Sequence, residues 1–196
     1  ESGSITKMLN GNQGITIDGI QHPRAIYTLW TEAERNAIGI YTVEYDNSNK
    51  KDERWYINTD QSYAFGSGKV TATYGTATAR AHADTLFTAQ DETDGKGTEG
   101  EVATRGLKYN LIQTVKSKAA NELAKTDWYV VRKSEESTAI PSAITTHRRL
   151  VRSKAAAMET SITNASDTPA LETLYTYTTD SDGVHSRPLA EIPTLD

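Results

Sequence analysis

The sequence predicts an α+β fold in which a small β-rich part precedes an antiparallel helical hairpin. Two patterns carry this prediction. Up to about residue 90, apolar and polar residues alternate as in half-buried strands, whereas residues 103–165 repeat apolar positions every three to four residues, as amphipathic helices do. A hydrophilic, glycine-bearing stretch at 91–102 separates the two patterns. We therefore expect one change of architecture within the chain.

The patterning divides the chain into five segments. They are an N-terminal arm (1–18), a Thr- and Tyr-rich β domain (19–90), an acidic Gly-rich linker (91–102), a helical hairpin domain (103–165) and an irregular C-terminal arm (166–196). The composition of both arms is too polar to order them unaided. We therefore expect residues 1–14 and 180–196 to lie against other subunits.

Turn and capping signals define the start of the β domain. Ile15–Ile17 has the composition of a short strand, and Asp18-Gly19 after it is a dipeptide favoured in hairpin turns. Thr31 and Glu34 have the spacing of a capping box, and Gly39 is placed for a left-handed stop. One short helix of roughly two turns is therefore expected between Thr31 and Gly39.

Strands are expected in the rest of the β domain. Alternation predicts them at 41–45, 55–57, 61–65, 69–74 and 76–82, with an exposed hairpin loop at 46–53 between the first two. The strands are rich in Thr, Ala and Tyr and poor in Leu and Ile, so each buries little apolar area. We expect them to pack against a helix or against another subunit.

Three helices are predicted after the linker. An apolar stripe with a spacing of four residues, from Leu107 to Leu123, predicts a helix over about 103–125. Thr126-Asp127 provides a cap for a short second helix that reaches about residue 136, and Ile140-Pro141 begins a third helix that extends past Ile162. We expect Trp128 to be packed in the bend between the two long helices.

Composition excludes several classes of protein. The chain has no Cys, which excludes disulfides, thiol nucleophiles and thiolate metal sites. No apolar run approaches the ~20 residues of a membrane span, and the first residues lack the basic-then-apolar pattern of a signal peptide. Only 36% of the residues are hydrophobic, so the expected core is thin.

Charge is distributed unevenly along the chain. Residues 101–165 contain 11 Lys and Arg against 6 Asp and Glu, whereas the remainder contains 10 against 20, within a net charge of −5. The third helix carries the basic row Arg148, Arg149 and Arg152. We interpret this row as a face that meets acidic surfaces of this chain or of a neighbour, and not as a nucleic-acid site, because that needs a denser basic stripe.

The sequence contains no motif for catalysis, for a cofactor or for a metal. The four histidines are scattered, and the P-loop, dinucleotide, hydrolase and zinc-protease patterns are absent. The acidic turns at 91–95 and 180–183 resemble calcium loops but lack the ligand pattern of an EF-hand. We interpret Trp30, Trp55 and Trp128 as core or interface anchors, with a sugar-binding platform as the alternative. No enzyme activity is expected.

Three stretches together resemble a known family. They are Gly19–Pro23 with Leu29–Thr31 and Glu34–Ile40, Thr126–Lys133 (TDWYVVRK), and Ile140-Pro141 with His147–Arg149 and Val151-Arg152. In this order they resemble virion and tail-associated proteins of marine bacteriophages, and a related helical hairpin occurs in phage tail-fibre assembly proteins. The resemblance covers 19–45 and 106–165. It departs from the family at His147-Arg148, where relatives carry Tyr-Arg.

The resemblance implies a non-enzymatic structural subunit of a phage virion, in the tail or in the baseplate and tail-fibre attachment region. Such a subunit is assembled in the cytoplasm of the infected bacterium and contacts other tail proteins and copies of itself, with no nucleic acid and no membrane involved. The alternatives are a tail-fibre assembly chaperone that leaves before the particle is complete and a host-surface adhesin that binds a glycan. The interface candidates are Trp30, Trp55, Trp128, Arg148, Arg149 and Arg152.

Overall fold

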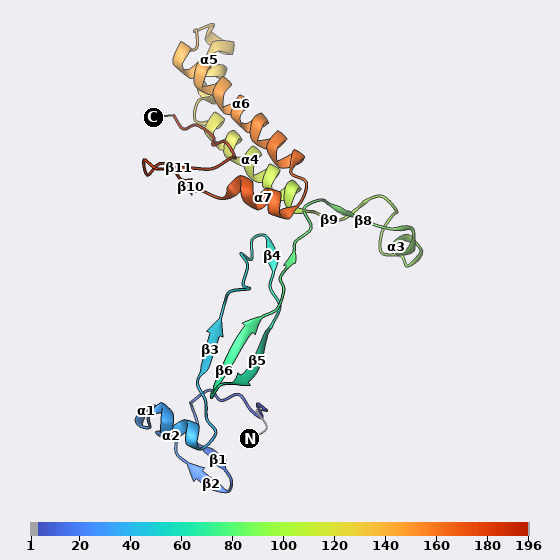
Figure 1. Ribbon diagram of the computed structural model, residues 1–196. Helices are drawn as coiled ribbons and strands as arrows, with labels where there is room; N and C mark the ends of the chain where they lie inside the picture. Colours follow the sequence, from blue (N-terminus) through green and yellow to red (C-terminus); the bar gives the residue numbers. More distant parts are fainter. Residues whose placement is uncertain (1–3, 196) are drawn as a thin grey trace. The chain divides into compact units, whose positions relative to one another are not determined.

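The computed structural model describes residues 4–195 and contains both helices and strands, which confirms the α+β class (Figure 1). The chain divides into two compact units, a β unit (Glu1–Thr78) and a helical unit (Ala79–Asp196). The division therefore lies before the expected linker at 91–102. Residues 79–84 belong with the helices because the backbone N–H of Leu107 donates to the Ala81 carbonyl (3.0 Å) and that of Gly106 donates to the Asp84 carboxylate (2.7 Å).

The β unit begins with the predicted turn. Strands β1 (Ile15–Ile17) and β2 (Ile20–His22) pair antiparallel across the two residues Asp18 and Gly19. Both turn residues have positive φ, at 50° and 80°. A two-residue hairpin turn needs left-handed backbone, which Gly adopts freely and Asp tolerates.

Two short helices follow this hairpin. The predicted one is α2 (Glu32–Ala37), and its capping box is present because the Glu34 N–H donates to Thr31 Oγ1 (3.3 Å) while the Glu34 carboxylate accepts from the Thr31 N–H (2.7 Å). The preceding α1 (Ile26–Leu29) was not expected. It is a single turn without a side-chain cap, held by the buried side chain of Ile26.

Three strands form the main sheet of the β unit, in the order β3-β6-β5. β5 (Gln61–Gly66) and β6 (Lys69–Tyr74) form an antiparallel hairpin, and β3 (Val43–Asp46) pairs parallel to β6. The expected hairpin of the first two strands is therefore wrong, since β4 (Tyr56–Ile57) pairs with β7 (Thr78–Ala79). The longer β6 offers β3 a full-length partner that the two-residue β4 cannot provide.

The expected linker contains secondary structure. The helix α3 (Ala89–Thr93) begins at a capping box between Thr88 and Asp91, and it lies between strands β8 (Thr85–Leu86) and β9 (Val102–Thr104), which pair antiparallel. The hydrophilic composition did not predict these elements, because the segment is ordered by local hydrogen bonds more than by apolar burial.

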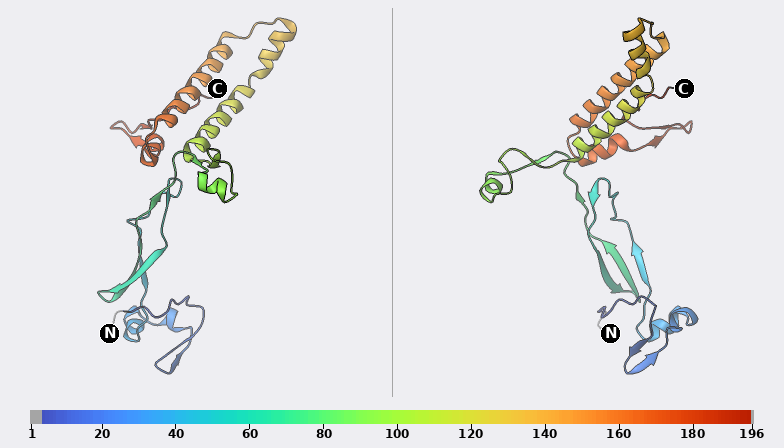
Figure 2. Two further views of the ribbon diagram at one scale, coloured as in Figure 1. Left: turned by 90° about the vertical axis from the view of Figure 1, so that its right-hand side faces the viewer. Right: turned by 180° about the vertical axis from the view of Figure 1, so that it is seen from behind.

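The helical hairpin is present as predicted. Helix α4 (Leu107–Ala124) packs along α6 (Ser142–Asn164), and the short α5 (Asp127–Glu136) lies at the bend between them (Figure 2). The predicted stripes form the core. Its buried apolar members are Val115 and Ala119 of α4 and Ile144, Val151, Ala155, Met158 and Ile162 of α6.

The C-terminal arm is neither irregular nor directed away from its own chain. It contains helix α7 (Thr168–Tyr175) and the paired strands β10 (Thr178–Thr179) and β11 (His185–Ser186). Leu189, beyond the hairpin, is fully buried, and its N–H donates to the Leu174 carbonyl (3.0 Å). The described part of this arm therefore packs on its own unit, and contact with other subunits stays a prediction; Asp196 lies outside the described residues.

Candidate interaction surface

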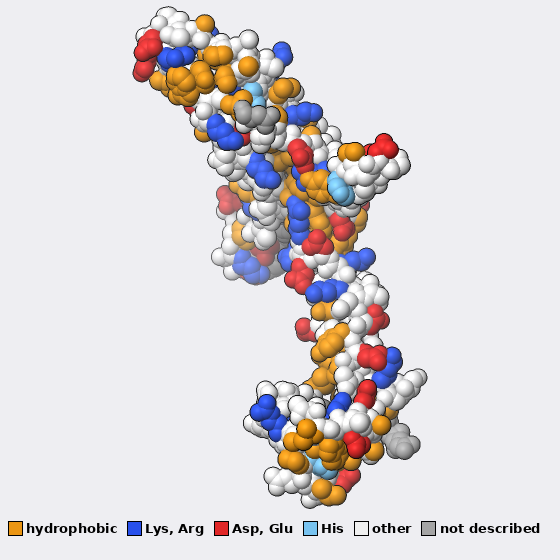
Figure 3. Space-filling view, turned by 90° about the vertical axis from the view of Figure 1, so that its left-hand side faces the viewer, with side chains coloured by type: hydrophobic (Ala, Val, Ile, Leu, Met, Phe, Trp, Pro, Cys, Tyr) orange, Lys and Arg blue, Asp and Glu red, His pale blue; other side chains and the backbone are white. Residues whose placement is uncertain are grey.

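The short helix α5 exposes its largest apolar side chains. Trp128 and Val131, which lie one turn apart, are each 52% exposed. The expectation that Trp128 is packed in the bend between α4 and α6 is therefore wrong. Thr126 occupies that position instead, with its side chain completely buried. Figure 3 shows hydrophobic side chains gathered at the end of the helical unit that carries α5.

An arginine stacks on the aromatic residues of α5. The rings of Trp128 and Tyr129 lie 4.1 Å apart between centroids, and the Arg132 guanidinium lies 4.5 Å from the Trp128 ring and 5.7 Å from the Tyr129 ring. The Nε of Arg132 is buried without a hydrogen-bond partner. We call Trp128, Tyr129, Val131 and Arg132 the α5 patch. Trp, Tyr and Arg are the residues most enriched at binding hot spots.

Arg148 of α6 fixes the start of α5. Its Nη1 donates to the Leu123 carbonyl (2.8 Å) and to Thr126 Oγ1 (2.7 Å), and it forms an ion pair with Asp127 (2.8 Å). Arg148 is only 8% exposed, and the acidic group that it meets is Asp127 of this chain. The bend between α4 and α5 leaves carbonyl and hydroxyl oxygens that face α6, and a guanidinium can satisfy several of them at once. The α5 patch therefore has a fixed orientation on the helical unit.

A second buried polar group lies beside the same bend. Glu122 of α4 is 5% exposed, and its carboxylate accepts from Lys125 Nζ (2.6 Å) and from the backbone N–H of Leu195 (2.8 Å). His147 is also buried, and its Nε2 lies 3.2 Å from Glu122 Oε1 without the alignment of a hydrogen bond. The hydrogen bonds from Lys125 and Leu195 hold the pKa of Glu122 below its usual value. Glu122 thus connects α4 to the C-terminal arm.

The remaining predicted interface residues are divided between the two units. Arg149 and Arg152 are exposed on α6, with Arg152 Nη1 3.5 Å from the Arg148 carbonyl. Trp30 and Trp55 belong to the β unit, where Trp30 is half-buried against the ring of His22 and Trp55 is 3% exposed. Trp55 is therefore a core residue.

Sequence reasoning missed Glu122, Val131 and Arg132. A signal for Glu122 was available, because it lies three residues after the stripe position Ala119 and so on the buried face of α4. Arg132 lies four residues after Trp128, which is the spacing at which helix side chains meet. Val131 lies three residues after Trp128 and so has the same kind of spacing, but its exposure has no local signal, since exposure of an apolar residue depends on what packs against it.

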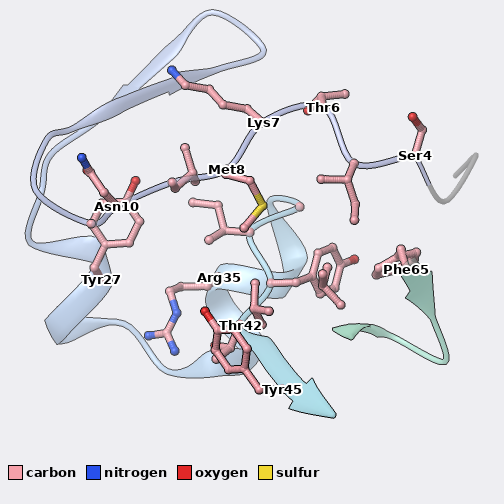
Figure 4. A pocket seen from close by; sticks show the side chains of 18 residues that line it. Ser4, Thr6, Lys7, Met8, Asn10, Tyr27, Arg35, Thr42, Tyr45 and Phe65 are labelled. Carbon is pink, nitrogen blue, oxygen red and sulfur yellow. The ribbon is translucent and has the colours of Figure 1, made fainter. Parts of the chain in front are cut away.

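The β unit holds a cavity of about 960 Å³. It lies between the N-terminal segment 4–11 and the main sheet, and its lining includes Tyr27, Arg35, Tyr41 and Phe65 (Figure 4). Tyr41 and Phe65 contact each other, with ring centroids 4.6 Å apart. The N-terminal segment thus lies over its own unit.

The described residues contain neither a cluster of candidate metal ligands nor a membrane-spanning helix. Among residues 4–195, no group of three or more His, Asp or Glu side chains is placed to hold a metal ion. None of the helices in this part combines the length and the apolar composition needed to cross a membrane. Comparison with known proteins adds no family, since no family model, curated protein or solved structure matches the chain.

Proposed function

We propose that this chain is a non-enzymatic structural subunit of a bacteriophage tail and that it binds a neighbouring tail protein through the α5 patch. The observation that carries the proposal is the exposure of Trp128 and Val131 on a helix whose orientation Arg148 fixes. A rigid patch loses little conformational freedom on binding, which favours affinity. The TDWYVVRK stretch that resembles phage tail proteins is the sequence of this helix and its cap.

The first test of the proposal uses purified phage particles. Mass spectrometry of purified particles of the phage that encodes the chain is expected to find it in a fixed ratio to a tail protein. An assembly chaperone would be present in the infected cell but missing from purified particles, and this result would replace the proposed role by that of a chaperone. An adhesin would also remain in particles, but its removal would abolish host attachment without preventing tail assembly.

The α5 patch is tested by a pair of variants on the same helix. Val131→Asp places a charge in the patch, whereas Val130→Asp places the same charge on the side of α5 turned away from Trp128, where Val130 is also exposed. Loss of a hot-spot contact worth about 2 kcal/mol weakens binding roughly 30-fold. We expect Val131→Asp to be excluded from particles and Val130→Asp to be incorporated normally. Equal incorporation of both variants would show that the α5 patch is not the docking surface.

A further inference from the structure

The β unit has too small a core for its length. Its buried apolar side chains among the described residues are Ile26, Ile40, Trp55, Val70 and Ala72. Domains of this size are marginal even when they bury about 60% of the surface that the unfolded chain exposes. A unit with so few buried side chains gains stability mainly from surface that it buries against something else.

One face of the main sheet provides such surface. The strand register places Val43, Val70 and Phe65 in one row across β3, β6 and β5, and Tyr45, Ala72 and Tyr63 in the next. Paired residues share a face of the sheet, so these six side chains form one apolar face. Ala72 is fully buried at its centre, while the tyrosines on either side of it remain 63% (Tyr45) and 41% (Tyr63) exposed.

The same face also contains the cavity. Val43, Phe65 and Val70 line it from the sheet, and Tyr45 lies at its border (Figure 4). The opposite wall is segment 4–11, whose backbone makes no hydrogen bond to the backbone of any other described residue. Among the described residues, no backbone ladder therefore joins this wall of the cavity to the sheet.

We propose that this sheet face binds the same face of a second copy of the chain, with Tyr45 and Tyr63 of each copy entering the cavity of the other. A two-fold interface brings a patch onto itself and therefore requires that the patch complement its own shape. This face meets the requirement because it carries both protruding tyrosines and a cavity. Binding of a different protein would require this face to carry only a protrusion or only a cavity, and not both.

The charged residues that line the cavity also favour a second copy of the chain as its occupant. Among the residues that the structure describes, Lys7 and Arg35 are the charged ones that line it and no Asp or Glu does so, in a chain with a net charge of −5. Cations attract the faces of tyrosine rings. The interface adds buried apolar surface to the core of the β unit in each copy. It gives the proposed tail subunit a second binding surface, which does not depend on the α5 patch.

The inference is tested by adjacent residues of β5. Tyr63 lies on the apolar face, and Ala64 is exposed on the opposite face of the same strand. Sedimentation equilibrium of the full chain is expected to give twice the mass of one chain for the wild type and for Ala64→Asp, and that of one chain for Tyr63→Asp. Because each dimer carries the change twice, association is expected to weaken by far more than the roughly 30-fold of a single hot spot.

A cross-linking experiment captures the contact covalently, so that it is detected even where the substitution weakens association. The chain has no cysteine, so a single introduced thiol reports one position. With a short bis-maleimide, Tyr63→Cys is expected to yield a covalent dimer and Ala64→Cys none. A monomeric wild type, or identical behaviour of the two positions in both experiments, would overturn the inference. A dimer that is missing from phage particles would leave the inference intact and contradict the proposed tail function instead.

Discussion

Arg148 is a buried charged residue, whereas its neighbour Arg149 lies on the surface. The two differ because Arg148 faces the oxygens of Leu123, Thr126 and Asp127 at the bend, whereas Arg149 points away from α4. A basic row in a sequence is therefore not a uniform surface. A charge reversal at Arg148 would perturb folding, so Arg149 and Arg152 remain as the exposed members of the row.

Replacement of Arg148 tests its role in the bend. We expect Arg148→Met to lower the free energy of unfolding by about 2–3 kcal/mol, because hydrogen bonds to a charged group are lost and a buried hydroxyl and carbonyl lose their partner. The matched change Arg149→Met is expected to alter it by no more than about 0.5 kcal/mol, as exposed substitutions do. Urea denaturation followed by far-UV circular dichroism measures both. Similar values for the two variants would contradict the internal role.

The tryptophans give a second comparison at this scale. Trp55 is 3% exposed and Trp128 is 52% exposed. We expect Trp55→Ala to destabilise the β unit by about 3–5 kcal/mol, as deletion of a large buried aromatic does, and Trp128→Ala to cost less than about 1 kcal/mol. Denaturant melts followed by circular dichroism provide the values. A cost for Trp128→Ala as large as that for Trp55→Ala would mean that the α5 patch is part of the core.

The elements that the sequence predicts are those whose own residues form a local pattern, such as an apolar stripe or a helix cap. Helices α4 and α6 follow from stripes that recur every three to four residues, and the ends of α2 follow from Thr31, Glu34 and Gly39. Helix α7 was missed, although Asp167 caps it and Pro169 lies in its first turn, because its eight residues sit in a polar background. Its stability comes from contacts of Leu171 and Leu189 that no local pattern reports.

Pairing and exposure were harder to predict than the elements themselves. The parallel pairing of β3 with β6 joins residues 27 positions apart in the chain, and alternation does not encode a partner. The same holds for the candidate site. Trp128 was identified as an anchor, but its exposure depends on how Arg148 and Thr126 fill the bend, which is a tertiary property.

Acid is expected to release the last residues of the C-terminal arm. The pKa of Glu122 is lowered by its bonds with Lys125 and Leu195, so its carboxylate stabilises the folded arm above the ordinary glutamate pKa of about 4.3. This stabilisation is lost as the pH falls through the lowered pKa. The groups that face the carboxylate are the Lys125 ammonium, the His147 ring and the Leu195 amide.

Amide hydrogen exchange measures this release residue by residue. Protection of the Leu195 amide is expected to fall at acid pH, whereas protection of the Leu189 amide, which donates to a carbonyl that does not titrate, is expected to change less. Glu122→Gln keeps an acceptor oxygen and removes the titration, so the pH dependence at Leu195 is expected to disappear in that variant. Persistence of the dependence in Glu122→Gln would assign it to another group.

At the scale of the whole molecule, two units with different sources of stability share one chain. The helical unit buries a continuous core between α4 and α6, while the β unit buries few side chains and carries two exposed tyrosines, Tyr45 and Tyr63, on the apolar face of its sheet. If the β unit is completed by a second copy, its melting temperature rises with protein concentration, because association stabilises the folded state by mass action. The helical unit has no such requirement, and its melting temperature is expected to stay constant.

One variant of the full chain separates the two transitions. Trp128 is the sole tryptophan of the helical unit, so in Trp128→Phe the fluorescence reports only Trp30 and Trp55 of the β unit. Circular dichroism at the helical band reports mainly α4, α5 and α6. We expect the fluorescence transition to occur at a lower temperature and to shift upward with concentration, while the dichroism transition does neither. Addition of Tyr63→Asp is expected to abolish the concentration dependence and leave the helical transition unchanged, since that residue lies in the other unit. A single transition, coincident by both probes and independent of concentration, would show that the two units fold as one cooperative body without a second copy.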